Sequence, residues 1–428
     1  MSAASELEIW ADRLLGQPDD PEQVHFRIVD LLSAFTVGLQ TDEGRALARL
    51  HVARGGTGDT AATVAAIARQ SESDDIELTS CVTPGAVVIP VALACGRGCS
   101  PQAIGRAICR GYEAGIIPGR AIGGARALPK TWPTLLAAPA MAVVTHCFLH
   151  GCDRETLVHA MALALAGSSG GAGRPAGSPS GRWIVFAEAV RKGIDAAEAA
   201  NAGFKGDPQL CAGDWWQMQA GHSDIDRSVF TNPVWPHINE TDFKPFPIAR
   251  QGATAVEAFQ HLLAKGLDPN TIESIEAFVP AMNTAILSRP AIAGDRVSLL
   301  CNLGFQLACA AFAPDALFDP QRKGATPALI DFSKRVTVAP ASEFNKTSRW
   351  PARLIVKTAN QTLVEELEQI RLGSPLTDDA GLREKWRRIL HADDRQDFFA
   401  NVVNAPPGSH AMLWNWVQHR LARAGAAA

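Results

Sequence analysis

The chain has 428 residues, 47% hydrophobic and 20% charged, which is enough for a large core and predicts two or three domains. A formal net charge of −4 argues against a protein that binds nucleic acid or an anionic membrane surface. The nine cysteines include no second pair at zinc spacing, which indicates reduced thiols and no metal site. The apolar runs at 85–95 and 135–145 are too short to span a membrane, and no signal peptide begins the sequence. We therefore expect a soluble, cytoplasmic protein.

The first half of the chain is predicted to be helical. Apolar residues at helical spacing predict helices at residues 6–15, 21–40, 46–53 and 60–68. Ser100 and Asp153 are predicted N-caps of two further helices, and another helix starts at Trp132 and runs to about His150. This succession of helices with many small residues predicts a closely packed α-helical domain.

A loop rich in glycine, serine and proline, residues 167–181, separates two of these helices. Backbone N–H groups at the start of the next helix, together with Arg174 and Arg182, would suit a bound carboxylate or phosphate, and the alternative is a flexible surface loop. The loop is not a P-loop, because no Gly-Lys-Ser/Thr closes it. The following helix, to about Ala202, carries Ala, Val and Ile over most of its surface, which predicts that it lies inside the helical core.

The pattern changes after Asn232, where a stretch rich in proline and polar residues, 231–247, indicates a domain boundary. Helices are predicted at residues 252–265 and 296–312. Strands are predicted at residues 273–280, 335–338, 352–357 and 361–367, the last two as a hairpin. The chain ends in predicted helices at residues 379–391, 395–403 and 410–424, which we expect to return to the helical domain.

Several short stretches occur in an order and spacing typical of one known family. They are Thr83–Pro90, Gly111–Gly115, Ala166–Ser168, Gly193–Gly206, Phe243–Pro247, Gly266–Pro269 and Gly373–Asp378. Together they make the chain resemble the MmgE/PrpD family, whose members include 2-methylcitrate dehydratase, cis-aconitate decarboxylase and an iminodisuccinate epimerase. The resemblance covers nearly the whole chain, although each stretch alone is unspecific.

The resemblance implies a mainly α fold, with a large helical domain and a smaller α+β lid domain. The domains would be 1–242 for the first part of the helical domain, 243–382 for the lid, and 383–428 for C-terminal helices that return to the helical domain. It further implies a homodimer, an active site between the two domains, and no metal or organic cofactor.

Three positions depart from the family's pattern in the helical half. Thr83 stands where a histidine precedes the Pro-Ser/Gly-Ala motif, and Trp132 takes the place of a second histidine. Arg182 begins a stretch that replaces Lys-Arg-Leu-His. Neither Thr83 nor Trp132 titrates in the useful range, so the usual proton-transfer groups are altered.

Other positions are closer to the pattern. Lys244, in Lys-Pro-Phe-Pro, is unchanged, and Arg250 falls where many members carry a basic residue. Glu72 corresponds to the aspartate of the acidic patch, with Asp75 nearby, and Phe305 takes the place of an aromatic hydroxyl. The resemblance thus implies catalytic roles for Lys244, Arg182, Glu72 and Asp75. It implies substrate-binding roles for Thr83, Trp132, Arg174, Ser168, Arg250 and Phe305.

The family's chemistry removes a proton next to a carboxylate, which requires a base and cations that hold the developing charge. The first hypothesis is a 2-methylcitrate dehydratase-like lyase acting on a small carboxylic acid, with loss of water or CO2 and with Lys244, Glu72 or Asp75 as a re-sited base. A cofactor-free isomerase or epimerase of a dicarboxylic acid is the alternative, and a catalytically silent carboxylate-binding homologue is the third. Trp132, Trp183, Val185 and Phe305 predict a substrate with an apolar body.

Overall fold

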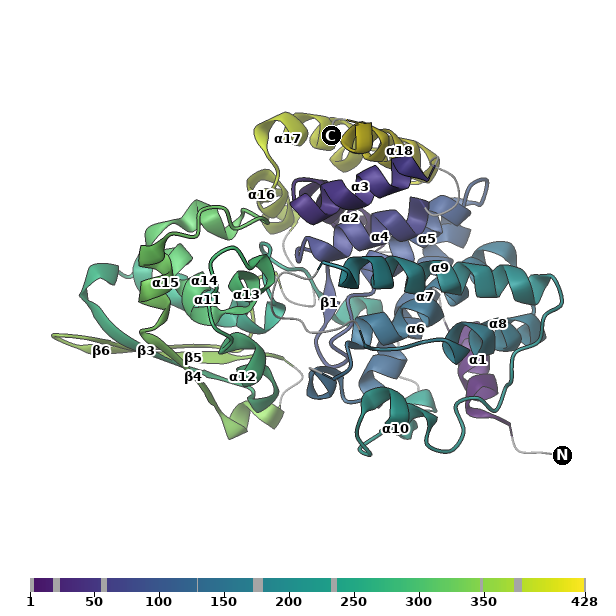
Figure 1. The fold of residues 1–428 in the computed structure, drawn as a ribbon, viewed down its shortest axis with the longest axis horizontal. Helices are drawn as coiled ribbons and strands as arrows, with labels where there is room; N and C mark the ends of the chain where they lie inside the picture. Colours follow the sequence, from purple (N-terminus) through teal and green to yellow (C-terminus); the bar gives the residue numbers. More distant parts are fainter. Residues whose placement is uncertain are drawn as a thin grey trace. The chain divides into compact units, whose positions relative to one another are not determined.

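The computed structural model describes residues 4–17, 24–54, 60–128, 130–171, 180–231, 237–346, 349–372 and 379–426. The chain divides into two compact units (Figure 1). The first contains the described residues up to 171, residues 180–242 and the residues from Leu390 onward, and the second contains residues 243–389. The prediction of a mainly α fold with a smaller α+β part is confirmed.

The first unit is built almost entirely of helices. Their bounds are α1 Glu6–Gly16, α2 Val24–Leu39, α3 Asp42–Ala53, α4 Thr60–Gln70, α5 Gly85–Cys95, α6 Pro101–Ala121, α7 Pro133–His150, α8 Arg154–Ala166, α9 Arg182–Asn201, α10 Trp215–Ala220, α17 Ala392–Phe398 and α18 His410–Ala426. Two short strands, β1 (Ile76–Glu77) and β2 (Thr241–Asp242), form an antiparallel pair. The C-terminal helix α18 packs against α3 and α5 and therefore belongs to the helical unit.

Two helices begin at the residues that were predicted to cap them. The Ser100 hydroxyl accepts a hydrogen bond from the Ala103 N–H and begins α6, and the Asp153 carboxylate accepts one from the Thr156 N–H and begins α8. Both predicted N-caps are confirmed. Each satisfies an N–H group that the helix itself cannot pair.

Helix α7 lies between α6 and α9 in the packing of the first unit. Among the described residues it alone is long and apolar enough to cross a membrane, yet 89% of it is buried inside the structure, as in the core helix of a soluble protein. Small residues allow the close packing: a Cβ on Gly193 of α9 would lie 2.4 Å from the backbone oxygen of Pro139 in α7.

The prediction that the long helix α9 lies inside the core is wrong. One face is buried, with Trp183, Phe186 and Val190 on it, but the opposite face is exposed. Exposed positions recur every three or four residues, at Val185, Glu188, Lys192, Asp195 and Glu198. The prediction failed because many of the apolar residues in this helix are alanines, and alanine fits the buried face or the exposed face of a helix at little cost.

The second unit contains a four-stranded sheet in the order β4-β3-β5-β6. The strands are β3 Ile272–Val279, β4 Val336–Pro340, β5 Ala352–Thr358 and β6 Thr362–Leu367. β3 pairs parallel with β4 and antiparallel with β5, and β5 and β6 form the predicted hairpin. Ile275, Ala277 and Val279 are fully buried, so they share the predicted apolar face of β3.

The helices of this unit are α11 Ala253–Ala264, α12 Ala281–Leu287, α13 Arg296–Cys301, α14 Leu303–Phe312, α15 Pro327–Ser333 and α16 Asp379–Ile389. Helix α11 packs against β5, β6 and α14. A single helix over 296–312 was expected, but the chain breaks at Asn302. Its side chain accepts the Phe305 N–H at 2.6 Å and caps α14, since asparagine competes with the helical hydrogen bonds.

The second unit ends at Ile389, within the helix predicted over residues 379–391. The sequence placed the boundary at 382/383, which falls within α16, whereas the two units divide after Ile389. The guanidinium of Arg388 lies 3.8 Å from the ring centroid of Phe318, and this contact holds the end of α16 to the second unit.

Candidate functional site

The turn that follows α4 gathers acidic side chains around one arginine. Glu72 has a φ of +57°, a left-handed conformation that reverses the chain directly after the helix. Arg69 Nη1 lies 3.0 Å from a Glu72 carboxylate oxygen and 3.4 Å from one of Asp74. The side chain of Glu72 is 18% exposed and that of Asp74 is fully buried, so Glu72 is the more accessible of the two carboxylates.

Two guanidinium groups lie against the ring of Trp132, one of the predicted substrate-binding residues. The Arg182 guanidinium carbon is 4.6 Å from the ring centroid, and that of Arg69 is 5.3 Å from it. Arg182 was predicted from the resemblance, but Arg69 was missed. Its helical position in α4 marked it only as the last basic residue of an alanine-rich helix. We call Arg69, Trp132 and Arg182 the Trp132 cluster.

Aromatic side chains support the Trp132 cluster. Trp132 stacks on Phe186 with ring centroids 5.4 Å apart and meets the edge of Trp183 at 5.9 Å. Its backbone N–H donates to the carbonyl of Gly170 at 2.9 Å, so the start of the glycine-rich loop lies beside it. The predicted association of Trp132 with Trp183 is therefore present, and it gives the cluster an apolar wall next to its two cations.

Asp75 lies on the inner side of the same turn. Its carboxylate accepts the Tyr112 hydroxyl at 2.7 Å and the Gly85 N–H at 3.0 Å, and Arg27 Nη1 lies 3.8 Å away. Burial raises the pKa of Asp75 to about 6, against the opposing effects of Arg27 and Tyr112. A carboxyl with this pKa is suited to give and take a proton near neutral pH.

Gly85 is placed where a side chain would not fit. A Cβ on it would lie 2.7 Å from Asp75 Oδ1 and 2.8 Å from the Tyr112 hydroxyl. Tyr112 is fully buried, and burial and then Asp75 raise its pKa well above 10. Tyr112 thus acts as a hydrogen-bond donor to Asp75.

Thr83 belongs to the same region. Its backbone N–H and its hydroxyl both donate to the hydroxyl of Thr134, at 3.2 and 3.4 Å, and Thr134 lies two residues beyond Trp132. Asp75 contacts the backbone of Gly85, two residues after Thr83, and Thr83 contacts Thr134, two residues after Trp132.

Ser168 lines a cavity of about 680 Å³ between α7, α8 and α9. Val185 and Lys192 also line it, and Lys192 Nζ donates to the Gly167 carbonyl at 2.7 Å. Val185 therefore faces this cavity and is 39% exposed. Arg174, predicted to bind substrate, lies outside the described residues.

The remaining predicted residues belong to the second unit. Lys244 is 1% exposed, and Arg250 and Phe305 are fully buried. Arg250 Nη1 donates to the Thr254 hydroxyl at 3.3 Å, and Phe305 is held at the start of α14 by Asn302. The resemblance implied a substrate-binding role for Phe305, which stays a prediction, and its side chain is fully buried.

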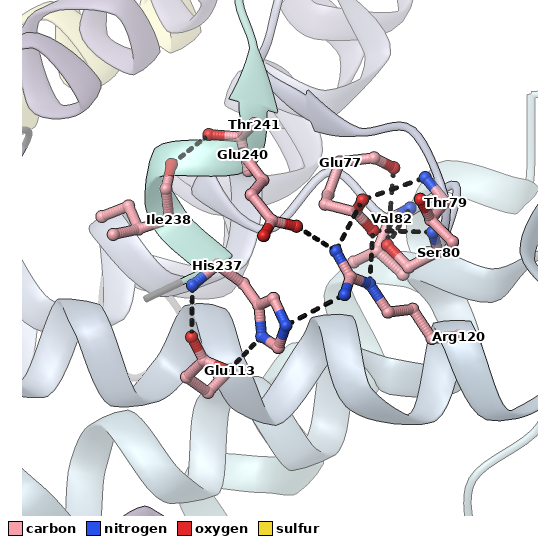
Figure 2. A network of polar contacts seen from close by, with 10 residues as sticks. All are labelled: Glu77, Thr79, Ser80, Val82, Glu113, Arg120, His237, Ile238, Glu240 and Thr241. Carbon is pink, nitrogen blue, oxygen red and sulfur yellow. Dashed lines mark hydrogen bonds and ion pairs between the residues drawn. The ribbon is translucent and has the colours of Figure 1, made fainter. Parts of the chain in front are cut away.

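A second polar cluster in the first unit was not predicted (Figure 2). Glu113 accepts the His237 backbone N–H at 2.8 Å and lies 2.5 Å from His237 Nδ1. Because a guanidinium can only donate, Arg120 Nη1 donates to His237 Nε2, 2.9 Å away. Arg120 also pairs with Glu77 at 3.1 Å and with Glu240. We call these five residues the Arg120 network.

The Arg120 network fixes the segment that leads out of the first unit. It ties His237 and Glu240, just before β2, to α6 and β1. Burial alone would raise the pKa of Glu77, but Arg120 and hydrogen bonds from Ser80 hold it below 4.5. The only hint in the sequence was Glu113 itself, which with Arg110 is one of two charged residues in the mostly apolar stretch 107–119.

In the parts of the chain that the structure describes, no group of three His, Cys, Asp or Glu side chains could hold a metal ion. The chemistry available at the Trp132 cluster is that of two guanidinium groups, an aromatic wall and nearby carboxyl groups. Guanidinium groups bind carboxylates through paired N–H donors.

Comparison with known proteins gives one finding. The family model of the MmgE/PrpD N-terminal domain matches residues 18–226, which include the Trp132 cluster, Asp75 and Thr83. No curated protein matches the sequence.

Proposed function

The chain belongs to the MmgE/PrpD family, and from this premise we propose that it is a lyase that removes a proton next to a carboxylate, with loss of water or CO2. Membership of this family favours a dehydratase-like activity. The observation that carries the proposal is the Trp132 cluster, two cations against one aromatic ring, in the same unit as a carboxyl with a pKa of about 6.

In this proposal Arg69 and Arg182 bind a carboxylate of the substrate. Removal of the neighbouring proton makes a dianionic, enolate-like state, and the two guanidinium groups stabilise its additional charge. The Trp132 ring contacts the apolar body of the substrate, and the buried rings of Trp183 and Phe186 hold it in place. The proposed substrate is thus an acid with one or two carboxylates and an alkyl or aryl part.

Asp75 is the proposed base. Its raised pKa leaves it ionised above about pH 6, which is where a general base for this chemistry is most effective. Glu72, more exposed and paired with Arg69, is the alternative base in the same unit. Lys244 is proposed as a catalytic residue from the family's pattern alone.

A dicarboxylic acid isomerase or epimerase is the second candidate. Thr83 donates its hydroxyl hydrogen to Thr134, and Trp132 lies between two guanidinium groups, so neither replaces the acid–base role of a histidine. A site with one titrating carboxyl can take a proton from a carbon and return one to it. This observation favours epimerisation over a reaction that needs two acid–base groups.

Proton NMR in D2O tests the proposal directly. The protein is mixed with 2-methylcitrate, cis-aconitate, iminodisuccinate, citraconate and a series of alkylsuccinates. We expect solvent deuterium to appear next to a carboxylate of an alkyl acid, and the product then separates a lyase, which forms an alkene, from an epimerase, which does not.

Two variants make the test specific. Asp75→Asn is expected to slow exchange by about 10²- to 10⁴-fold, the usual contribution of a general base. Asp224→Asn, which removes an exposed carboxylate paired with Arg126, serves as the control and is expected to leave exchange unchanged. If ligands bind but none exchanges a proton, the protein is a carboxylate-binding homologue and the proposal is wrong.

A further inference from the structure

Two cysteines meet where α7 ends. Gly151 follows the helix with a φ of +67°, and the Cys152 N–H donates to the Cys147 carbonyl at 3.1 Å. This hydrogen bond defines a Schellman motif, in which the side chains at these two positions contact each other. The interaction between the two thiols is the largest influence on the pKa of each of them.

The two thiols differ in accessibility and acidity. Cys147 is 1% exposed, whereas Cys152 is only partly buried. The hydrogen bond between them lowers the pKa of Cys152 to about 7 and raises that of Cys147. The Asn201 side-chain amide lies 3.4 Å from Cys152 Sγ, and rotation of this amide would present its NH2 group to a thiolate. Cys152 is therefore the nucleophile of the pair.

Both cysteines line a cavity of about 490 Å³ that also has arginines in its wall. Arg106 and Arg110 come from α6, and the Arg110 guanidinium lies 5.6 Å from the Phe148 ring centroid and donates to the Gln17 carbonyl. Positive charge in a cavity that contains a thiolate favours the approach of an anionic reaction partner.

We propose that Cys147 and Cys152 form a reversible redox pair that is oxidised by a small disulfide carrying carboxylates. The Cys152 thiolate attacks one sulfur of that disulfide and releases the other half as a thiolate. The Cys147 thiol then attacks Cys152 Sγ, displaces the second half, and gives its proton to it. A disulfide forms between the two cysteines, and two electrons pass to the small disulfide, which becomes two thiols.

This site lies outside the Trp132 cluster and the Arg120 network, and it does not depend on the proposed enzymatic function. A disulfide in a reducing compartment is transient, so the pair is suited to sensing rather than to stability. Cys95 provides a contrast within the same unit: it is also only partly buried, but burial and Glu198 raise its pKa to about 11.

Oxidised glutathione is the probe for this proposal, with peptide mass mapping as the readout. We expect a disulfide between Cys147 and Cys152 that dithiothreitol reverses. Cys147→Ala should stop the reaction at a mixed disulfide between glutathione and Cys152, and Cys152→Ala should give neither product. Cys95→Ala is the matched control and should react like the unaltered protein. Equal modification of Cys95 and Cys152, or no disulfide with Cys147, would overturn the proposal.

A second measurement isolates the role of the arginines. Arg106→Gln should slow the reaction with oxidised glutathione by about tenfold, because one steering charge is lost. The reaction with 2-hydroxyethyl disulfide, which is neutral, should keep its rate. Equal slowing with both disulfides, or with neither, would contradict the choice of an anionic oxidant.

Discussion

The Trp132 cluster and the Arg120 network both place arginine next to acidic groups in the first unit, but they are built differently. In the Arg120 network the guanidinium contacts Glu77, Glu240 and His237, and His237 in turn is held by Glu113 (Figure 2). In the Trp132 cluster, two guanidinium groups lie against an indole ring, and one of them, that of Arg69, is also paired with Glu72 and Asp74.

This difference separates a structural cluster from one suited to a ligand. Around His237, buried side chains form hydrogen bonds and ion pairs with one another. The hydrogen-bonding capacity of the charged groups is therefore used within the fold. Stacking uses only the face of a guanidinium, and its N–H edges bond to carboxylates, as the guanidinium of Arg69 does with Glu72 and Asp74. We therefore expect loss of stability from changes in the Arg120 network and loss of activity from changes in the Trp132 cluster.

The largest effect on stability is expected for Glu113→Ala. The substitution leaves the buried His237 without its acceptor, and we expect the free energy of unfolding to fall by about 3–5 kcal/mol. Glu240→Ala removes an ion-pair partner whose side chain is 42% exposed and should cost less than about 1 kcal/mol. Urea unfolding followed by circular dichroism measures the free energy of unfolding of both variants. Similar losses would contradict the prediction that the buried Glu113 contributes more than the partly exposed Glu240.

The raised pKa of Asp75 predicts a pH-dependent stability. Its pKa lies at about 6 in the folded chain and near 3.8 when unfolded, so the folded state holds the proton more tightly. Its contribution is fully present below pH 3.8 and is lost as the pH rises through 6, a change on the order of 3 kcal/mol. The measurement is the free energy of unfolding of the unaltered protein and of Asp75→Asn between pH 4 and pH 7. The unaltered protein should lose stability as the pH rises through 6, and the variant should not show this loss. Parallel curves would mean that Asp75 ionises normally.

Arg182→Gln sharpens the comparison from the other side. Loss of a charged hydrogen bond to substrate is expected to cost about 1.5–3 kcal/mol, which lowers kcat/KM by about 10- to 100-fold. Its free energy of unfolding should fall by about 0.5–2 kcal/mol, because the stacking of the half-buried guanidinium on Trp132 and Trp183 is lost. Arg126→Gln, an exposed arginine paired with Asp224, is the control for both measurements. A large loss of stability without loss of activity would place Arg182 with the structural residues.

The smallest effect is expected for Tyr112→Phe. The Tyr112 hydroxyl lowers the pKa of Asp75, so its removal should move the acidic limb of the pH–rate profile to higher pH. The rate at the plateau should be retained, because the base itself is unchanged. If the midpoint of the pH–rate profile stays the same and the plateau rate falls, Tyr112 only supports the packing.

The elements that the sequence predicted well are those with local causes. Ser100 and Asp153 begin helices through their own side chains, and the alternation in β3 follows from burial of one face. The prediction for α9 failed because alanine carries no information about which face is buried. The prediction of a single helix over 296–312 was wrong because the apolar pattern continues through Asn302. This residue can either continue a helix or cap a new one, and the apolar pattern does not show which.

The functional roles assigned to the candidate site stay predictions. Glu72, Trp132 and Arg182 meet through Arg69, and Thr83 contacts Thr134, two residues beyond Trp132. Sequence reasoning missed Arg69 because nothing in an isolated helix shows that its guanidinium will meet an indole more than sixty residues away. It missed the Arg120 network for the same reason, since that network joins α6 to residues just before β2.

The space around Gly85 links three positions in evolution as well as in structure. Its missing side chain makes room for the hydrogen bond between Asp75 and Tyr112, because a Cβ there would lie within 2.8 Å of both. A residue larger than glycine at 85 is tolerated only if one of the other two becomes smaller in the same lineage. Homologous sequences should therefore show correlated substitutions at 75, 85 and 112, and drift at any one of them should be rare while the other two are retained.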